Sequence, residues 1–140
     1  MNREAIYAAL FAKLAAIPGL VTMSRKLKHW ADVQPIEQPA LYLAQKTETA
    51  QPQTGLPPKW LLSVDVYVYV RTTGADAPGP VINPILDAVA AALEPDNPIR
   101  NTCTLGGLVE WARIEGTIET DEGTLGDQAV AIVPINILAV

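Results

Sequence analysis

The sequence predicts an α+β domain in which an antiparallel or mixed β-sheet carries two amphipathic helices packed on one face. Apolar side chains recur at helical spacing in residues 3–17 and 84–93, and they alternate at strand spacing most clearly in residues 61–71. Each helical segment has a single apolar stripe, which suits packing on one side of a sheet. At 140 residues the chain has the size of one domain, and no internal repeat or second domain is visible in residues 1–140.

The first helix is expected over residues 3–17. Its apolar residues recur at spacings of four, four and three and therefore line one face: Ile6, Leu10, Leu14 and Ile17. Asn2 is placed to cap the helix, and Pro18-Gly19 is a typical helix end. Residues 21–27 have no helical period and are interpreted as a short first strand.

The next segments are expected to be extended. Pro35 and Pro39 bracket a short extended stretch, because proline removes a backbone donor and disfavours helix. Residues 40–46 read as a strand with Leu41 and Leu43 on one face and Tyr42 on the other.

The clearest strand is residues 61–71, with valines on one face and polar or aromatic residues on the other. Residues 47–58 contain three prolines and a glycine among polar residues, so they are predicted to be a long loop joining two antiparallel strands. On the polar face of residues 61–71, Tyr67 and Tyr69 either pack under a helix or contact a partner. Residues 72–80 are predicted to be a second loop.

The second helix is expected over residues 84–93. Asn83 would cap it, Pro84 suits its first position, and Pro95 follows its end. Its apolar stripe consists of Ile85, Leu86, Val89 and Leu93.

The C-terminal part reads as β-structure. A strand is predicted over residues 108–115 and continues after a bulge at 116–119, a turn follows at 121–123, and a final apolar strand spans 129–138. Pro134 lacks a backbone N–H, so the final strand should lie at a sheet edge or be bulged there. An apolar edge invites pairing with another chain, which makes Pro134 a candidate interface residue.

Charge is distributed unevenly along the chain. The basic residues of positions 1–30 are Arg3, Lys13, Arg25, Lys26 and Lys28, and the acidic residues of positions 101–140 are Glu110, Glu115, Glu119, Asp121, Glu122 and Asp127. This pattern is either solvated surface or a head-to-tail contact between copies. The second interpretation gives Arg25, Lys26, Lys28, Glu119, Asp121 and Glu122 as candidate subunit-interface residues. A net charge of −5 disfavours sequence-specific nucleic-acid binding.

No catalytic, cofactor-binding or metal-binding motif is present. His29 is the single histidine and Cys103 the single cysteine, so neither a zinc site nor a nucleophile–base pair is indicated, and no phosphate-binding loop occurs. We therefore expect no enzyme activity, no metal and no cofactor. No apolar run approaches the roughly 18 residues of a membrane span, and the N-terminus does not read as a signal peptide.

The order of short motifs resembles the tail terminator (tail completion) proteins of long-tailed bacteriophages and related prophages. The helix 3–17 is followed by Arg25, Trp30-Ala31-Asp32, Gln38-Pro39-Ala40-Leu41-Tyr42-Leu43, Gly55-Leu56-Pro57, the strand 64–70, the helix 83–93, Pro95, Thr104-Leu105-Gly106-Gly107-Leu108-Val109 and Val133-Pro134-Ile135. The resemblance covers most of the chain.

The resemblance implies an α+β subunit that forms a ring, typically a hexamer, on the head-proximal end of the tail tube. Such a ring ends tube polymerisation and joins the head, so the implied partners are other copies, the tail tube protein and the head–tail connector protein. The implied location is the virion, with assembly in the host cytoplasm.

The residues expected to contact the tube or connector lie in or next to the predicted loop at 47–58, because long exposed loops often carry function. They are Gln53, Thr54, Gly55 and Leu56 in the loop, with Trp60 just after it. Two alternatives remain open: another neck component, such as a head-closure or tail-joining protein, and a small cytosolic enzyme or ligand-binding domain.

Overall fold

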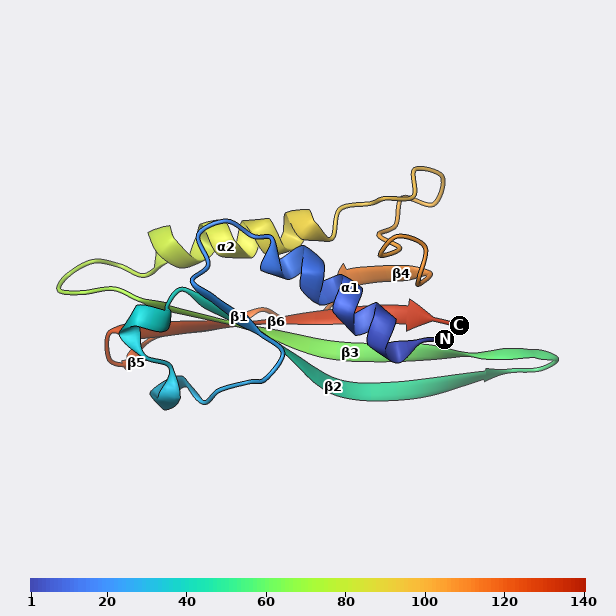
Figure 1. Cartoon of the computed structure of the whole chain (residues 1–140), viewed down its shortest axis with the longest axis horizontal. Helices are drawn as coiled ribbons and strands as arrows, with labels where there is room; N and C mark the ends of the chain where they lie inside the picture. Colours follow the sequence, from blue (N-terminus) through green and yellow to red (C-terminus); the bar gives the residue numbers. More distant parts are fainter.

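The computed structural model describes residues 1–140, except the side chains of Thr124 and Leu125. It confirms the predicted α+β class: a six-stranded mixed sheet carries two helices on one face (Figure 1). The helices are α1 (Arg3–Ala15) and α2 (Gly79–Ala92). The strands are β1 (Thr22–Ser24), β2 (Ala40–Gln53), β3 (Leu56–Arg71), β4 (Trp111–Ile114), β5 (Glu119–Leu125) and β6 (Gln128–Ala139). They lie in the order β1-β2-β3-β6-β4, and β5 also pairs with β6.

The first helix follows its prediction closely. The Asn2 side chain accepts a hydrogen bond from the Ala5 N–H at 3.0 Å, as expected of an N-cap. The predicted apolar face is buried, and Tyr7 joins it with 1% exposure.

The predicted start of the second helix is wrong. The helix begins at Gly79, so Pro84 lies inside it and Asn83 does not cap it. Pro80 occupies the first turn, where a missing N–H costs nothing, whereas Pro84 lies inside the helix and leaves the Pro80 carbonyl without its intrahelical donor. The predicted apolar stripe is nevertheless correct, since Ile85 and Val89 are buried.

The helix-facing side of the sheet holds the core. Val64, Val66 and Val68 on β3 are at most 1% exposed, and Ile135 and Ile137 on β6 are fully buried. At about 25 cal/mol for each Å² of apolar surface removed from water, this layer is the main source of stability.

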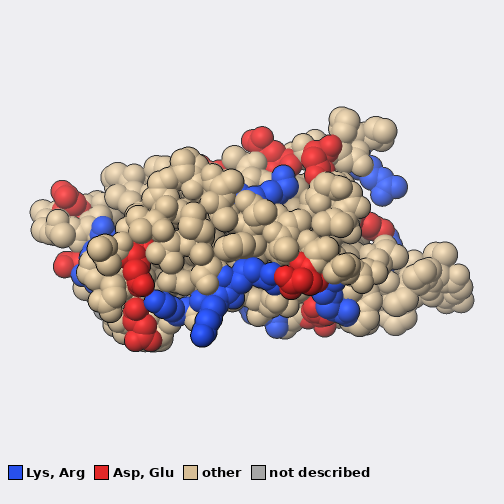
Figure 2. Space-filling model, in the orientation of Figure 1, with Lys and Arg blue, Asp and Glu red and all other residues tan. Residues whose placement is uncertain are grey.

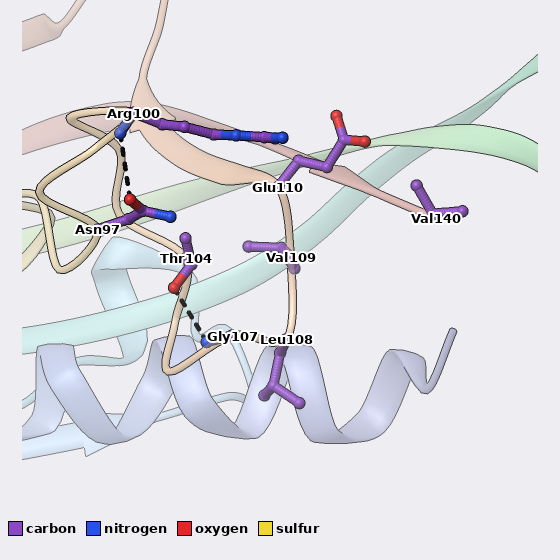
Figure 3. Close-up of a pocket in the computed structure, with 8 residues that line it drawn as sticks. All are labelled: Asn97, Arg100, Thr104, Gly107, Leu108, Val109, Glu110 and Val140. Atoms are coloured by element: carbon purple, nitrogen blue, oxygen red, sulfur yellow. Dashed lines mark hydrogen bonds between the residues drawn. The ribbon is translucent and has the colours of Figure 1, made fainter.

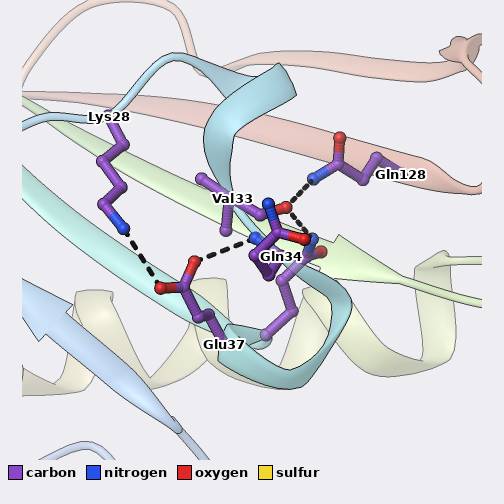
Figure 4. A network of polar contacts seen from close by, with 6 residues as sticks. Lys28, Val33, Gln34, Glu37 and Gln128 are labelled. Atoms are coloured by element: carbon purple, nitrogen blue, oxygen red, sulfur yellow. Dashed lines mark hydrogen bonds and ion pairs between the residues drawn. The ribbon is translucent and has the colours of Figure 1, made fainter.

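Residues 25–39 cover one end of the opposite sheet face. They form two short 3-10 turns, Trp30–Asp32 and Pro35–Glu37, so the second turn replaces part of the extended stretch predicted between the prolines. Val33 packs against Tyr42 and Tyr69, which means that Tyr69 lies under this segment rather than under a helix. The Val33 carbonyl accepts a hydrogen bond from the Gln128 side-chain amide, and Glu37 pairs with Lys28 (Figure 4).

Two predictions about the C-terminal strands are wrong. β6 is not an edge strand, because it lies between β3 and the β4/β5 side of the sheet. The Pro134 carbonyl accepts the Glu115 N–H at 3.2 Å, so the backbone groups of Pro134 face the β4/β5 side of β6. The missing N–H of Pro134 therefore falls where the ladder on that side is interrupted between β4 and β5. The turn predicted at 121–123 lies within β5, and the chain reverses at Gly126-Asp127 instead.

Within the described residues, no helix is long and apolar enough to cross a membrane.

Candidate functional site

The main projecting feature of the molecule is a two-stranded hairpin arm, defined here as residues 47–60. The prediction that residues 47–58 form a loop is wrong, because β2 and β3 continue antiparallel pairing until Gln53 lies opposite Leu56. β6 ends its pairing with β3 at Trp60, so the arm beyond this point has no third strand beside it. In Figure 1 it extends past the rest of the domain, with both chain termini near its base.

The tip of the arm is a tight turn at Thr54-Gly55. Gly55 has a φ of +73°, a backbone conformation that favours glycine. The structure brings the predicted contact residues Gln53, Thr54, Gly55 and Leu56 together at this tip, and Leu56 is 63% exposed. It does not bring Trp60 to them.

Trp60 lies at the base of the arm, which is held by side chains of α1. The Arg3 guanidinium lies 4.9 Å from the centre of the Trp60 ring. Arg3 also pairs with Glu48 at 2.6 Å, and the Tyr7 hydroxyl donates to the same carboxylate at 3.0 Å. The hydrogen bond from Arg3 lowers the pKa of Glu48, whereas burial, followed by the bond to Glu48, raises the pKa of Tyr7 to about 12.

A second pair fixes the other strand of the base: Lys59 lies 2.9 Å from Glu110. Sequence reasoning did not identify Arg3, Tyr7, Glu48, Lys59 or Glu110, because each contact joins residues far apart in the chain and no local motif marks them. The base of the arm is therefore anchored and its tip is exposed.

The outer arm carries no charge. Residues 49–58 contain no Asp, Glu, Lys or Arg, and the projecting end is uncharged in Figure 2. Pro52, Pro57 and Pro58 have no backbone N–H, so the arm offers few donors to a further strand. The arm is consequently suited to contact through its exposed side chains rather than through its backbone edges.

The candidate interface residues lie at two separate ends of the sheet. Arg25, Lys26 and Lys28 follow β1, whereas Glu119, Asp121 and Glu122 lie on β5. Arg25 pairs with Glu4 at 2.5 Å and Lys28 with Glu37 at 3.1 Å. The structure thus does not bring the two charged groups together. Pro134, on the non-edge strand β6, lines a surface hollow with Glu119 but with none of the three basic candidates.

A surface hollow of about 390 Å³ lies between the loop after α2 and Val140 (Figure 3). Arg100 and Glu110 supply its charges, and Glu110 is already paired with Lys59. Its other lining residues are Asn97, Thr104, Gly107, Leu108, Val109 and Val140. This lining holds no histidine or cysteine, and the described side chains contain no group of three metal ligands.

The single histidine and the single cysteine have structural contacts. His29 Nδ1 accepts the Ala31 N–H at 3.2 Å and caps the first 3-10 turn. Cys103 is buried in the core and bridges to Ala112 on β4.

Comparison with known proteins finds the fold but no close relative. No protein-family model and no curated protein sequence matches the chain. A chain from the virion of a native gene transfer agent particle matches with a TM-score of 0.57 and 12% identity, over 97% of this chain and 95% of that one. A second solved chain, described only by a sequence identifier, matches with a TM-score of 0.55 and 18% identity, over 98% and 96%. At these identities the likeness shows a shared fold along nearly the whole length.

Proposed function

We propose that the chain is a structural subunit of a phage or phage-like virion and that it has no enzyme activity. The observation that carries this proposal is the fold match to a virion chain over nearly the full length of both proteins. The order of short motifs in the sequence, which resembles that of tail terminator proteins, supports the same class.

The more specific proposal is a tail terminator. A ring of these subunits would cap the head-proximal end of the tail tube, stop its polymerisation and present the surface that joins the head. An anchored arm with an uncharged, exposed tip suits contact with the tube or the connector, because such contacts bury neutral and apolar surface at little desolvation cost.

Electron microscopy of particles from the parent phage, with the gene deleted, tests this role. Termination predicts overlong or unjoined tail tubes beside DNA-filled heads. Tails of normal length that fail only to join heads would assign the chain to another part of the neck. Fully normal virions would contradict a structural role altogether.

A further inference from the structure

The sheet has an unpaired strand edge at each end. β1 pairs with β2 along one side, β5 pairs with β6 along one side, and no described strand lies on the other side of either. An open edge presents backbone N–H and C=O groups to which another strand can be added.

The first of these surfaces, the β1 edge, comprises residues 20–28. The N–H groups of Val21 and Thr22 both bond inward to the Pro39 carbonyl, at 2.8 Å and 3.3 Å, so within the three residues of β1 it is the backbone groups of Met23 that face outward. Exposed apolar side chains lie along it: Val21 at 57%, Met23 at 36% and Leu27 at 43%. Exposed apolar side chains beside an arginine are typical of a contact surface.

The second surface, the β5 edge, comprises residues 118–122. Glu119 and Glu122 are exposed, Asp121 is half-buried, and the neighbouring Ile118 is 40% exposed. Among the described side chains no ion pair involves these three acids.

Part of the outer edge of β2 is also open, because the short β1 does not cover it. This part is less suited to pairing with another strand. The register shifts between Gln45 and Thr47, which makes Lys46 an extra residue in the strand, and Pro52 follows further along. A bulge, a lysine and a proline on an edge are all features that block addition of a strand. The strand β1 itself contains no bulge, lysine or proline, and its three residues can pair with three of the four regularly paired residues of β5 at 119–122.

We infer that the β5 edge of one copy pairs with the β1 edge of a second copy, so that the sheet continues from subunit to subunit. The acids on β5 would then lie beside Arg25, Lys26 and Lys28, whereas pairing two β5 edges would place like charges together. The exposed pairs of Arg25 with Glu4 and of Lys28 with Glu37 do not prevent this, because such pairs contribute little and exchange readily.

Because the two edges differ, the contact is heterologous, and it yields a ring when its rotation closes. Closure of the contacts into a ring rests on the proposed function, whereas the contact between the two edges does not.

Zero-length carbodiimide cross-linking tests the contact, since it joins carboxylates only to lysines that touch them. An equal mixture of ¹⁴N- and ¹⁵N-labelled protein distinguishes links between copies by mass spectrometry. The expected product links Lys26 or Lys28 of one copy to Glu119, Asp121 or Glu122 of another. The Lys59–Glu110 pair, at 2.9 Å within one chain, is the internal control. Formation of the control link at high protein concentration without any link between the two edges would overturn the inference.

Charge reversal gives a second, independent test by sedimentation of the folded protein. The variant Glu119→Lys/Asp121→Lys/Glu122→Lys and the variant Arg25→Glu/Lys26→Glu/Lys28→Glu should each lose self-association, and an equal mixture of the two should regain it. Lys13→Glu, at a half-buried position of α1 outside both edges, is the control for a reversed basic charge elsewhere. Loss of association without recovery in the mixture would contradict the pairing. Overlong tails on gene deletion together with a missing edge link would reject this contact while leaving the terminator role intact.

Discussion

Asp96 shows how one exposed side chain orders the loop between α2 and β4. Its carboxylate accepts the Thr104 N–H at 2.6 Å, the Thr104 hydroxyl at 2.8 Å and the Gly106 N–H at 3.1 Å. These hydrogen bonds, with that from Gly106 the largest cause, lower the pKa of Asp96 to about 2. The same loop carries Thr104 and Gly107, which line the surface hollow of about 390 Å³.

Replacing Asp96 with Asn should destabilise the protein and change its response to acid. A carboxyl whose pKa is lowered by folding stabilises the native state above its unfolded pKa of about 4, and that contribution is lost as the pH falls toward about 2. Urea unfolding should therefore show a lower midpoint for Asp96→Asn at neutral pH and a smaller decline between about pH 4 and pH 2 than for the wild type. Asp87→Asn, on the exposed side of α2, is the control, and an equal decline in Asp96→Asn would contradict this role.

A core substitution should behave quite differently from one at the tip of the arm. Ile135 is fully buried, so Ile135→Ala should lower the free energy of unfolding by about 2–5 kcal/mol, as expected when a buried aliphatic side chain is cut back. Leu56→Ala, at a site 63% exposed, should change it by less than about 0.5 kcal/mol. Denaturant unfolding measures both values. A large loss at Leu56 would mean that the tip packs on the domain.

At the scale of elements, the hairpin arm is the part of the molecule expected to contact a partner. Ala50 lies directly opposite Trp60 in the register, so residues 51–59 can be replaced by Asn-Gly, a sequence suited to a two-residue hairpin turn. The shortened protein should fold with a core like that of the wild type, because nothing in the replaced segment belongs to the buried cluster.

Production of this variant in the deletion strain should leave tails overlong or unjoined, while the full-length chain restores them. A matched variant that keeps the arm length and changes only Lys59→Gln should retain most activity, since it removes one partly exposed ion pair. Tail length and head attachment are read by electron microscopy. Full restoration by the shortened protein would show that the arm does not make the contact.

The arm also shows where sequence reasoning succeeds and where it fails. Residues 61–71 were recognised as a strand because one face is buried, and burial imposes alternation. Residues 47–58 are exposed or half-buried, so no alternation marks them as strands, and their prolines suggested a loop. The tip was still identified, because a turn residue pattern marks it, but the anchoring contacts of Arg3 and Glu48 join distant parts of the chain and leave no local signal.

The predictions based on Pro134 and Pro84, an edge strand and a helix start, are wrong for a related reason. Each removes a backbone donor, and the sequence alone does not say how the structure absorbs that loss. At Pro134 the neighbouring strand is interrupted, and at Pro84 the helix, which begins earlier than predicted, continues through the proline without that hydrogen bond.

For the whole molecule, opposite charges at opposite ends of one sheet predict association that depends on salt. The basic residues that follow β1 and the acids of β5 lie at the two ends of the strand order. Exposed charges are screened over roughly 10 Å at 0.1 M salt and roughly 3 Å at 1 M, so self-association should weaken as salt rises. Sedimentation over this range measures the effect. An association that strengthens with salt would indicate an apolar contact elsewhere.

Electron cryomicroscopy of the intact parent particle tests the central claim most directly, because it locates the subunit. The account predicts density matching this fold as a single ring at the head-proximal end of the tail, with the hairpin arm in contact with the tube or the connector. Density for the chain elsewhere in the particle, or its absence from a particle with complete tails, would contradict the account.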